Sequence, residues 1–504
     1  MKHSDLATPF RRVGGRSIDI HGWDTVSVIR LGVLNDAIAA AGTSPKSFDG
    51  APDDGVAVAG RFGDWQISSD SDGDVVTFEM PLRDLLITEA GTQHPYASGT
   101  AMVEVKLRLL PHDPPNAAGV VHCLLVTDLR PQAGSEHAAV VTKVDLDGHS
   151  RIIDEAYVQI ALSDWLDANL ASFTHVFATV NIHRQIEEQE DFRWLKPSCV
   201  GYAFGYDSLD PAQSIMAVLC RTDGRTDKGL PYQVDADALP DGTSVAYLIS
   251  RQRFVRDMLT GALCRSFDGL QEDDLTINRL ENELNIKKDV ELKDVEYEGK
   301  TYDLTLEQLK VELREVDFHV DIQTATWVFP GIWSICNSNA AYGFGLITGK
   351  SGQKTLGYCE TEKMVSENSL RTSVGIKVLE WMLAIIAAIA AIVLTFVTFG
   401  AGSIMPAVLG ALLLGCGVSL LTLQIIEAVS EDDGPPLDLL LMNATEAVTW
   451  STGSAFVPTA AGLNGAMQIA GEFDTPSPAD TADTLTPPAR FQARYAAFME
   501  ARAQ

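Results

Sequence analysis

The residues with the greatest potential for chemistry in this chain of 504 residues are an acidic cluster, ten histidines and two glycine-rich stretches. The acidic cluster, DSDGD at positions 70–74, resembles the start of a calcium-binding loop, but its glycine comes too early. The twelfth position of such a loop needs a bidentate glutamate, and here it is Pro81. The cluster therefore predicts the turn of a β-hairpin over 63–80, and no calcium site.

The histidines and glycines give no catalytic pattern. No two histidines have the HxxxH or HExxH spacing that brings two imidazoles to one zinc ion. The stretches GGRS (14–17) and GFGLITGKSG (343–352) lack the spacing that cradles a phosphate group, and are expected in loops. We therefore expect a protein that is not an enzyme, with no catalytic residues, no metal site and no cofactor.

The charge balance excludes a class of partner. The chain has 68 acidic and 38 basic residues, a formal net charge of −30, and its one basic cluster is Arg11, Arg12 and Arg16. Because nucleic-acid binding needs clustered lysine and arginine, we expect no nucleic-acid partner. The seven scattered cysteines contain no CxxC, and no apolar run precedes residue 25. These features predict a cytoplasmic protein without a Sec signal peptide, with signal-independent release as the alternative.

The elements that would position any site alternate between helices and antiparallel strands. Helical spacing of apolar residues predicts helices over 22–40, 150–173 and 244–263. Ala101, Val103, Val105, Leu107 and Leu109 alternate with mostly polar residues, the period of an antiparallel strand with one buried face. Closing strands are expected over 451–473. The apolar phase slips near 314–315, which predicts a β-bulge and a strongly curved sheet. The fold class is α+β, with two halves that each combine a long helix with curved antiparallel strands.

Residues 381–426 form an uncharged, mostly apolar run. It predicts a helical hairpin within 376–427, with a first helix over about 376–398 and a second beginning at Ser403. Four interpretations stay open: a hairpin packed on the fold, a segment that enters membranes on a trigger, a permanent anchor, or a partner interface. The residues expected to contact a membrane or partner are Trp381, Ile386, Val393, Phe396, Leu409, Leu413 and Leu420.

Several segments together resemble a known family. They are IHGWDTVSVIRLGVLNDAI, FTHVFATVNI, RWLKPSCVGYAF, AVLCRTDGR, AYLISRQRFV and AGLNGAMQIAG, spread from about residue 20 to 472. This set resembles the forty-seven-kilodalton and OrfX proteins of clostridial botulinum neurotoxin gene clusters, in the tubular lipid-binding (TULIP) superfamily. The resemblance implies an elongated fold, long helices wrapped by highly curved antiparallel sheets, and no catalytic residues. It also implies a lipid or acyl chain as ligand.

These observations give a domain scheme and two functional hypotheses. The scheme is an N-terminal tail (1–18), a first TULIP-like half (19–215), a second half (216–472) and a linker with a C-terminal helix (473–504). The first hypothesis is a protein that binds a lipid or another hydrophobic ligand in an apolar groove. The second is a toxin-accessory scaffold that docks a partner protein from a toxin cluster, or a membrane surface, through the hairpin. The expected groove-lining residues are Val26, Val33, Leu34, Leu248, Val255, Leu259, Val316, Phe318, Val320 and Ile322.

Overall fold

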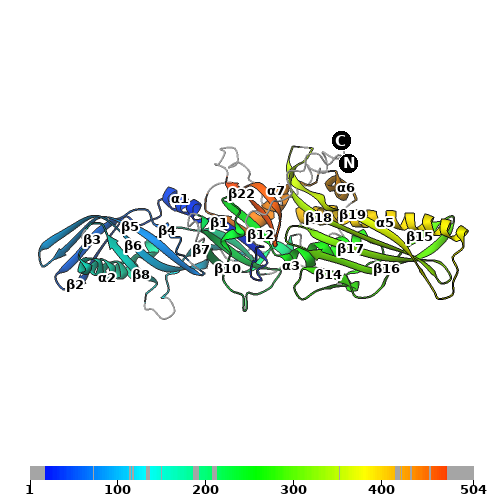
Figure 1. Ribbon diagram of the computed structural model, residues 1–504. Coiled ribbons are helices and arrows are strands. Elements are labelled where there is room, and N and C mark those ends of the chain that lie inside the picture. The colour runs from blue at the N-terminus through cyan, green and yellow to red at the C-terminus, as the bar shows by residue number, and fades with distance from the viewer. Residues whose placement is uncertain are drawn as a thin grey trace.

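The computed structural model describes residues 17–473, apart from 72, 113–114, 116–118, 132–136, 149, 185–191, 207–212, 351, 415–420, 422, 432–433 and 453–455. The tail before residue 17 and the segment after residue 473 lie outside the described residues. The molecule is elongated, and three antiparallel sheets follow one another along its length (Figure 1). This confirms an α+β fold dominated by antiparallel sheet.

The first sheet occupies one end of the molecule (Figure 1). Its main strand order is β2-β3-β5-β6-β7-β9-β20, with β4 on β5 and β8 on β6. On β6 the predicted alternation is confirmed, because Ala101, Val103, Val105 and Leu107 are buried. Helix α2 (Ile152–Asn169) packs against β2 and β8 and confirms the helix expected over 150–173. The strands are β2 (Ser47–Asp53), β3 (Val56–Phe62), β4 (Gln66–Ile67), β5 (Val75–Glu89), β6 (Thr92–Pro111), β7 (Val120–Thr127), β8 (Ala139–Leu146), β9 (Ala178–His183) and β20 (Val448–Trp450).

The central sheet takes strands from both predicted halves, in the order β10-β11-β1-β12-β22-β21. The hairpin β21–β22 confirms the closing strands expected near the C-terminus. The β4–β5 hairpin of the first sheet likewise confirms a hairpin over 63–80, although Asp72 itself lies outside the described residues. The central strands are β1 (Thr25–Arg30), β10 (Pro197–Gly205), β11 (Ile215–Thr222), β12 (Val245–Ile249), β21 (Phe456–Asn464) and β22 (Ala466–Phe473).

Two of the predicted helices begin as strands, so the sequence prediction was wrong there. The segment expected as a helix over 22–40 is β1 followed by α1 (Leu31–Ala41). The segment expected over 244–263 is β12 followed by α3 (Arg251–Arg253), the π-helix η5 (Phe254–Leu259) and α4 (Thr260–Ser266). Strands β1 and β12 pair with each other, and every residue of both is buried. Because both faces are covered, their apolar residues need not alternate, and a short run of this kind cannot be distinguished from helix by periodicity.

The second sheet has the main order β13-β14-β16-β17-β18-β19, with β15 on β16. The phase slip near 314–315 is a turn between β16 and β17, closed by the Arg314 N–H donating to the Asp317 carbonyl at 2.8 Å. The predicted bulge at that position was therefore wrong, although β16 has register shifts after Leu306 and opposite Leu292. Gly343 and Gly345, expected in a loop, lie within β18. The strands are β13 (Leu275–Ile277), β14 (Glu283–Ile286), β15 (Val290–Tyr297), β16 (Lys300–Leu313), β17 (Phe318–Phe329), β18 (Ile332–Thr348) and β19 (Lys354–Thr372).

Helix α5 (Glu380–Leu414) runs along the second sheet and replaces the predicted hairpin (Figure 1). The helix continues through the expected turn at 399–402 and contains Pro406. Packing against α4 and the sheet outweighs the low helix propensity of Gly402 and Pro406, and the Ser403 and Ser266 hydroxyls hydrogen-bond at 2.9 Å. Helices α6 (Leu423–Ser430) and α7 (Leu437–Ala447) follow.

Candidate functional site

The apolar core of the second sheet is built around α5. Ile386, Ile389, Val393 and Val397 are spaced by three or four residues and are buried, so they form one face of the helix. This face lies against β15, β17, β18 and β19, and α4 packs on the same helix. The sequence between Trp381 and Leu414 contains no charged residue.

The opposite face of the first turns of α5 is open to solvent. Leu383 is 46% exposed, and Ala384, Ala387, Ala391 and Thr395 are also exposed. An exposed helix face in a soluble protein is normally rich in charged residues, because water solvates them at little cost. This face, which we call the bare face of α5 (383, 384, 387, 391 and 395), is apolar or uncharged over about three turns.

The predicted groove-lining residues do not lie in one place. Five of them join the core under α5, two pack in the core of the first sheet, two lie in a cluster on the central sheet, and Val316 is an exposed turn residue. The core under α5 receives Val255, Leu259, Phe318, Val320 and Ile322. Val33 and Leu34 pack in the core of the first sheet, whereas Val26 and Leu248 belong to a third cluster on the central sheet. Of the predicted groove-lining residues, only the five in the core under α5 are brought together with that helix.

The predicted hairpin residues divide between the core and the surface. Ile386, Val393, Leu409 and Leu413 are buried in the core under α5. Trp381 is 58% exposed and meets the ring of Phe329 edge-on at 5.6 Å. The side chain of Phe396 and the whole of Leu420 lie outside the described residues. Among the residues that the structure describes, no helix is long and apolar enough to cross a membrane.

A network of buried charges, which sequence analysis did not identify as a site, joins one end of the central sheet to the helical segment α3–η5. Asp24 is fully buried; it pairs with Arg225 at 2.7 Å and Arg221 at 3.1 Å, and accepts the Thr222 N–H at 2.8 Å. Burial raises the pKa of Asp24, while the Thr222 N–H and both guanidinium groups oppose that rise. The same burial, with the neighbouring Arg253, lowers the pKa of Arg225 to about 10.

Arg253 is the most deeply buried cation of this network, with its side chain 2% exposed. It pairs with Asp257 at 3.1 Å and Asp223 at 3.7 Å, and donates to the Trp194 carbonyl at 3.1 Å. Burial raises the pKa of Asp257 to about 6, against the effect of Arg253 and Arg225. The charged residues come from the segments GWD, CRTDGR and SRQR, which begin or end strands at one end of the central sheet, and from Asp257 in η5. The segment RWLKP contributes the Trp194 carbonyl. The position of these charged segments beside strands was the available sequence signal, and the structure brings their side chains into one buried network.

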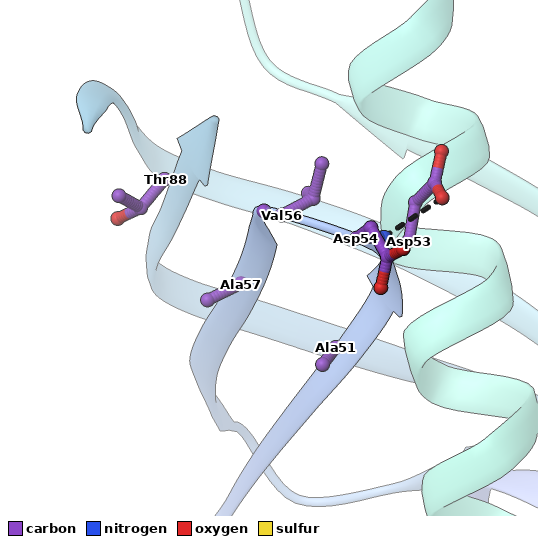
Figure 2. Close-up of a pocket in the computed structure, with 7 residues that line it drawn as sticks. Ala51, Asp53, Asp54, Val56, Ala57 and Thr88 are labelled. Carbon is purple, nitrogen blue, oxygen red and sulfur yellow. Dashed lines mark hydrogen bonds between the residues drawn. The ribbon is translucent and has the colours of Figure 1, made fainter. Parts of the chain in front are cut away.

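A shallow depression of about 680 Å³ lies at the β2–β3 turn. Figure 2 shows its lining residues, with Thr88 lying away from Asp53 and Asp54. Two carboxylates and a threonine without a facing base make no catalytic constellation. Across the described part of the chain, no three His, Cys, Asp or Glu side chains are grouped so that they could hold a metal ion.

Comparison with known proteins gives the family. The model of the OrfX-like family, described as protein OrfX2/OrfX3/P47, matches residues 20–471. Protein OrfX3 of Paraclostridium bifermentans is 27% identical over 492 residues, covering 92% of this chain and 99% of its own. Protein OrfX3 of Clostridium botulinum (strain Kyoto / Type A2) is 27% identical over 490 residues, covering 89% and 97%.

The fold also matches a solved structure. P47 from Clostridium botulinum A2 superposes with a TM-score of 0.62 at 14% identity, covering 90% of this chain and 98% of that one. At this identity the likeness supports the fold alone. With the family model matched over nearly the whole described chain, this protein belongs to the OrfX-like family of OrfX2, OrfX3 and P47 proteins.

Proposed function

We propose that this protein is a non-enzymatic, TULIP-type binder of a lipid or another hydrophobic ligand, held along the bare face of α5. The observation that carries the proposal is the uncharged, exposed side of a helix whose other side is core. An acyl chain laid on this face would remove apolar surface from water, and each fully buried methylene contributes about 0.8 kcal/mol. Such binding needs no polar motif, in agreement with the lack of one in the sequence.

The ligand test starts from protein purified in its folded state. Native mass spectrometry and solvent extraction should detect a bound lipid, or uptake of one when fatty acid or phospholipid is offered. Ala387→Glu places a charge on the bare face and should reduce uptake at least about tenfold. Ile160→Glu, at a 45%-exposed position of α2, is the matched control and should bind like the wild type. Protein that carries no lipid and takes up none would refute the proposal.

The same face supports a second candidate, a toxin-accessory role in which a partner protein from the same gene cluster covers α5. An uncovered apolar surface serves a protein interface as well as a lipid. Coexpression with the products of neighbouring genes, followed by size-exclusion chromatography, separates the two candidates. A stable complex that Ala387→Glu disrupts, formed by protein that binds no lipid, would favour the partner over the ligand.

A further inference from the structure

Helix α5 begins at the far end of the second sheet (Figure 1). The residues that lead into it carry exposed apolar side chains. Leu379 is 52% exposed, and Val374 is fully exposed. Folded proteins rarely leave so many large apolar side chains together in water unless they contact something. We call this cluster the distal end, and its apolar members are Leu370, Val374, Ile376, Leu379, Trp381 and Leu383.

The distal end is held in place by the sheet and is not a loose loop. The Ser373 N–H donates to the Gly331 carbonyl at 2.8 Å, which ties the segment after β19 to the β17–β18 turn. The ring of Trp381 packs edge-on against the ring of Phe329, which is the last residue of β17. The turn between β15 and β16 reaches the same end, because β16 runs antiparallel beside β17. The backbone beneath the cluster is therefore tied to the sheet, which lowers the entropy cost of ordering it against a partner.

The charges at this end nearly cancel, in contrast to the rest of the chain. The segments 298–300, 329–332 and 370–383 contain three basic residues, Lys300, Arg371 and Lys377, and two acidic ones, Glu298 and Glu380. Glu307 pairs with Arg371 at 2.5 Å and Asp289 acts on the same guanidinium, so the sum is 3 − 4 = −1. A chain of net charge −30 is repelled by anionic surfaces, but its distal end presents a nearly neutral apolar cluster. The partner that fits such a cluster is a surface with an apolar interior beneath neutral headgroups.

We propose that the distal end docks the protein end-on to a lipid bilayer with zwitterionic headgroups. Tryptophan beside aliphatic side chains is the composition that favours the boundary between headgroups and acyl chains. Helix α5, into which the cluster leads, begins at one end of the elongated molecule (Figure 1), so a flat bilayer can reach this end without a clash from the other sheets. The bare face of α5 starts at the same place, so a docked molecule would present its proposed ligand site beside the membrane.

The test is co-sedimentation of the full chain with phosphatidylcholine vesicles, with and without phosphatidylserine. The wild type should partition onto both vesicle types, with little change when salt is raised, because the docking surface carries almost no net charge. Combined Val374→Glu and Leu379→Glu should lower the partition coefficient at least about tenfold. Ile152→Glu, at an 85%-exposed apolar position on α2, should change it less than about twofold. Because all three positions are exposed, circular dichroism and thermal midpoints should match the wild type.

Three results would overturn the docking proposal: no partition of the wild type, equal partition of the double variant, or binding that needs phosphatidylserine and disappears in salt. Capture of a protein partner by the wild type but not by the double variant, without vesicle binding, would assign the end to that partner instead. Lipid uptake measured by native mass spectrometry is a separate readout. A double variant that still carries lipid but no longer docks would separate the two proposals.

Discussion

Replacement of Arg253 by methionine tests whether the buried charge network holds the joint between the central sheet and the helical segment α3–η5. Methionine keeps much of the apolar stem of arginine but leaves Asp257 and Asp223 without their shared cation. Breaking a buried ion pair by removing one partner typically costs about 3–5 kcal/mol. We expect a loss of this size in the free energy of unfolding.

The matched control is Lys350→Met, which removes a pair of similar length, 3.2 Å to Glu431, whose two side chains are each 62% exposed. Exposed pairs contribute about 0–1 kcal/mol, because water and salt screen them. Equilibrium urea unfolding followed by tryptophan fluorescence measures both variants. If Arg253→Met loses no more stability than Lys350→Met, the network does not hold the joint.

The effect of Arg253→Met on stability should also depend on pH. The folded-state pKa of Asp257 is raised to about 6 from 3.8, so the folded chain binds this proton more tightly than the unfolded chain. The ionised carboxylate therefore costs stability above pH 6, and this cost falls as pH decreases toward about 4. Without Arg253, ionising Asp257 in the folded protein costs more free energy. Arg253→Met should therefore lower the free energy of unfolding by less at about pH 5, where Asp257 can be protonated, than at about pH 8. Adding Asp257→Asn should recover part of the loss at the higher pH, and no recovery would argue against an orphaned carboxylate.

Two further predictions concern the cores. Burial lowers the pKa of His175 to about 4. As pH decreases, the imidazole of His175 is protonated in the unfolded chain before it is protonated in the folded chain. The free energy of unfolding should therefore decrease as pH is lowered from about 6.5 to about 4, by up to about 1.4 kcal/mol per pH unit. In urea unfolding at several pH values, His175→Phe should remove this dependence. Gly201→Ala would place its Cβ 2.4 Å from Cε1 of Tyr232, whose ring centroid lies 5.5 Å from that of Trp23. The substitution should lower the free energy of unfolding by about 1–3 kcal/mol, measured by thermal unfolding. The same change in a Tyr232→Ala background should cost less than half as much.

These two predictions have distinct contradicting results. An acid slope that persists in His175→Phe would assign the titration to another buried group. Equal costs of Gly201→Ala in both backgrounds would show that the tyrosine ring is not the obstacle.

Elements with one wet face could be predicted from the sequence. Strand β6 shows its alternation, and α2 its helical period, because water on one side forces polar residues into a regular pattern. Strands β1 and β12 were predicted as parts of helices, because a strand that is buried on both faces has no alternation of polar and apolar residues. The turn at 314–317 was mistaken for a bulge, since both shift the apolar phase by one residue.

The candidate site depended still more on tertiary contacts. The sequence by itself determined that residues 381–414 carry no charge, that lysine and arginine cluster along the chain only at Arg11, Arg12 and Arg16, and that no histidine pair has the HxxxH spacing of a zinc site. Only the tertiary structure decided which residues of α5 face the core and which remain bare, because that depends on where the second sheet lies. It also brought Asp24 close to Arg225 and Arg253, which lie more than 200 residues further along the chain, and no local spacing can encode such a contact.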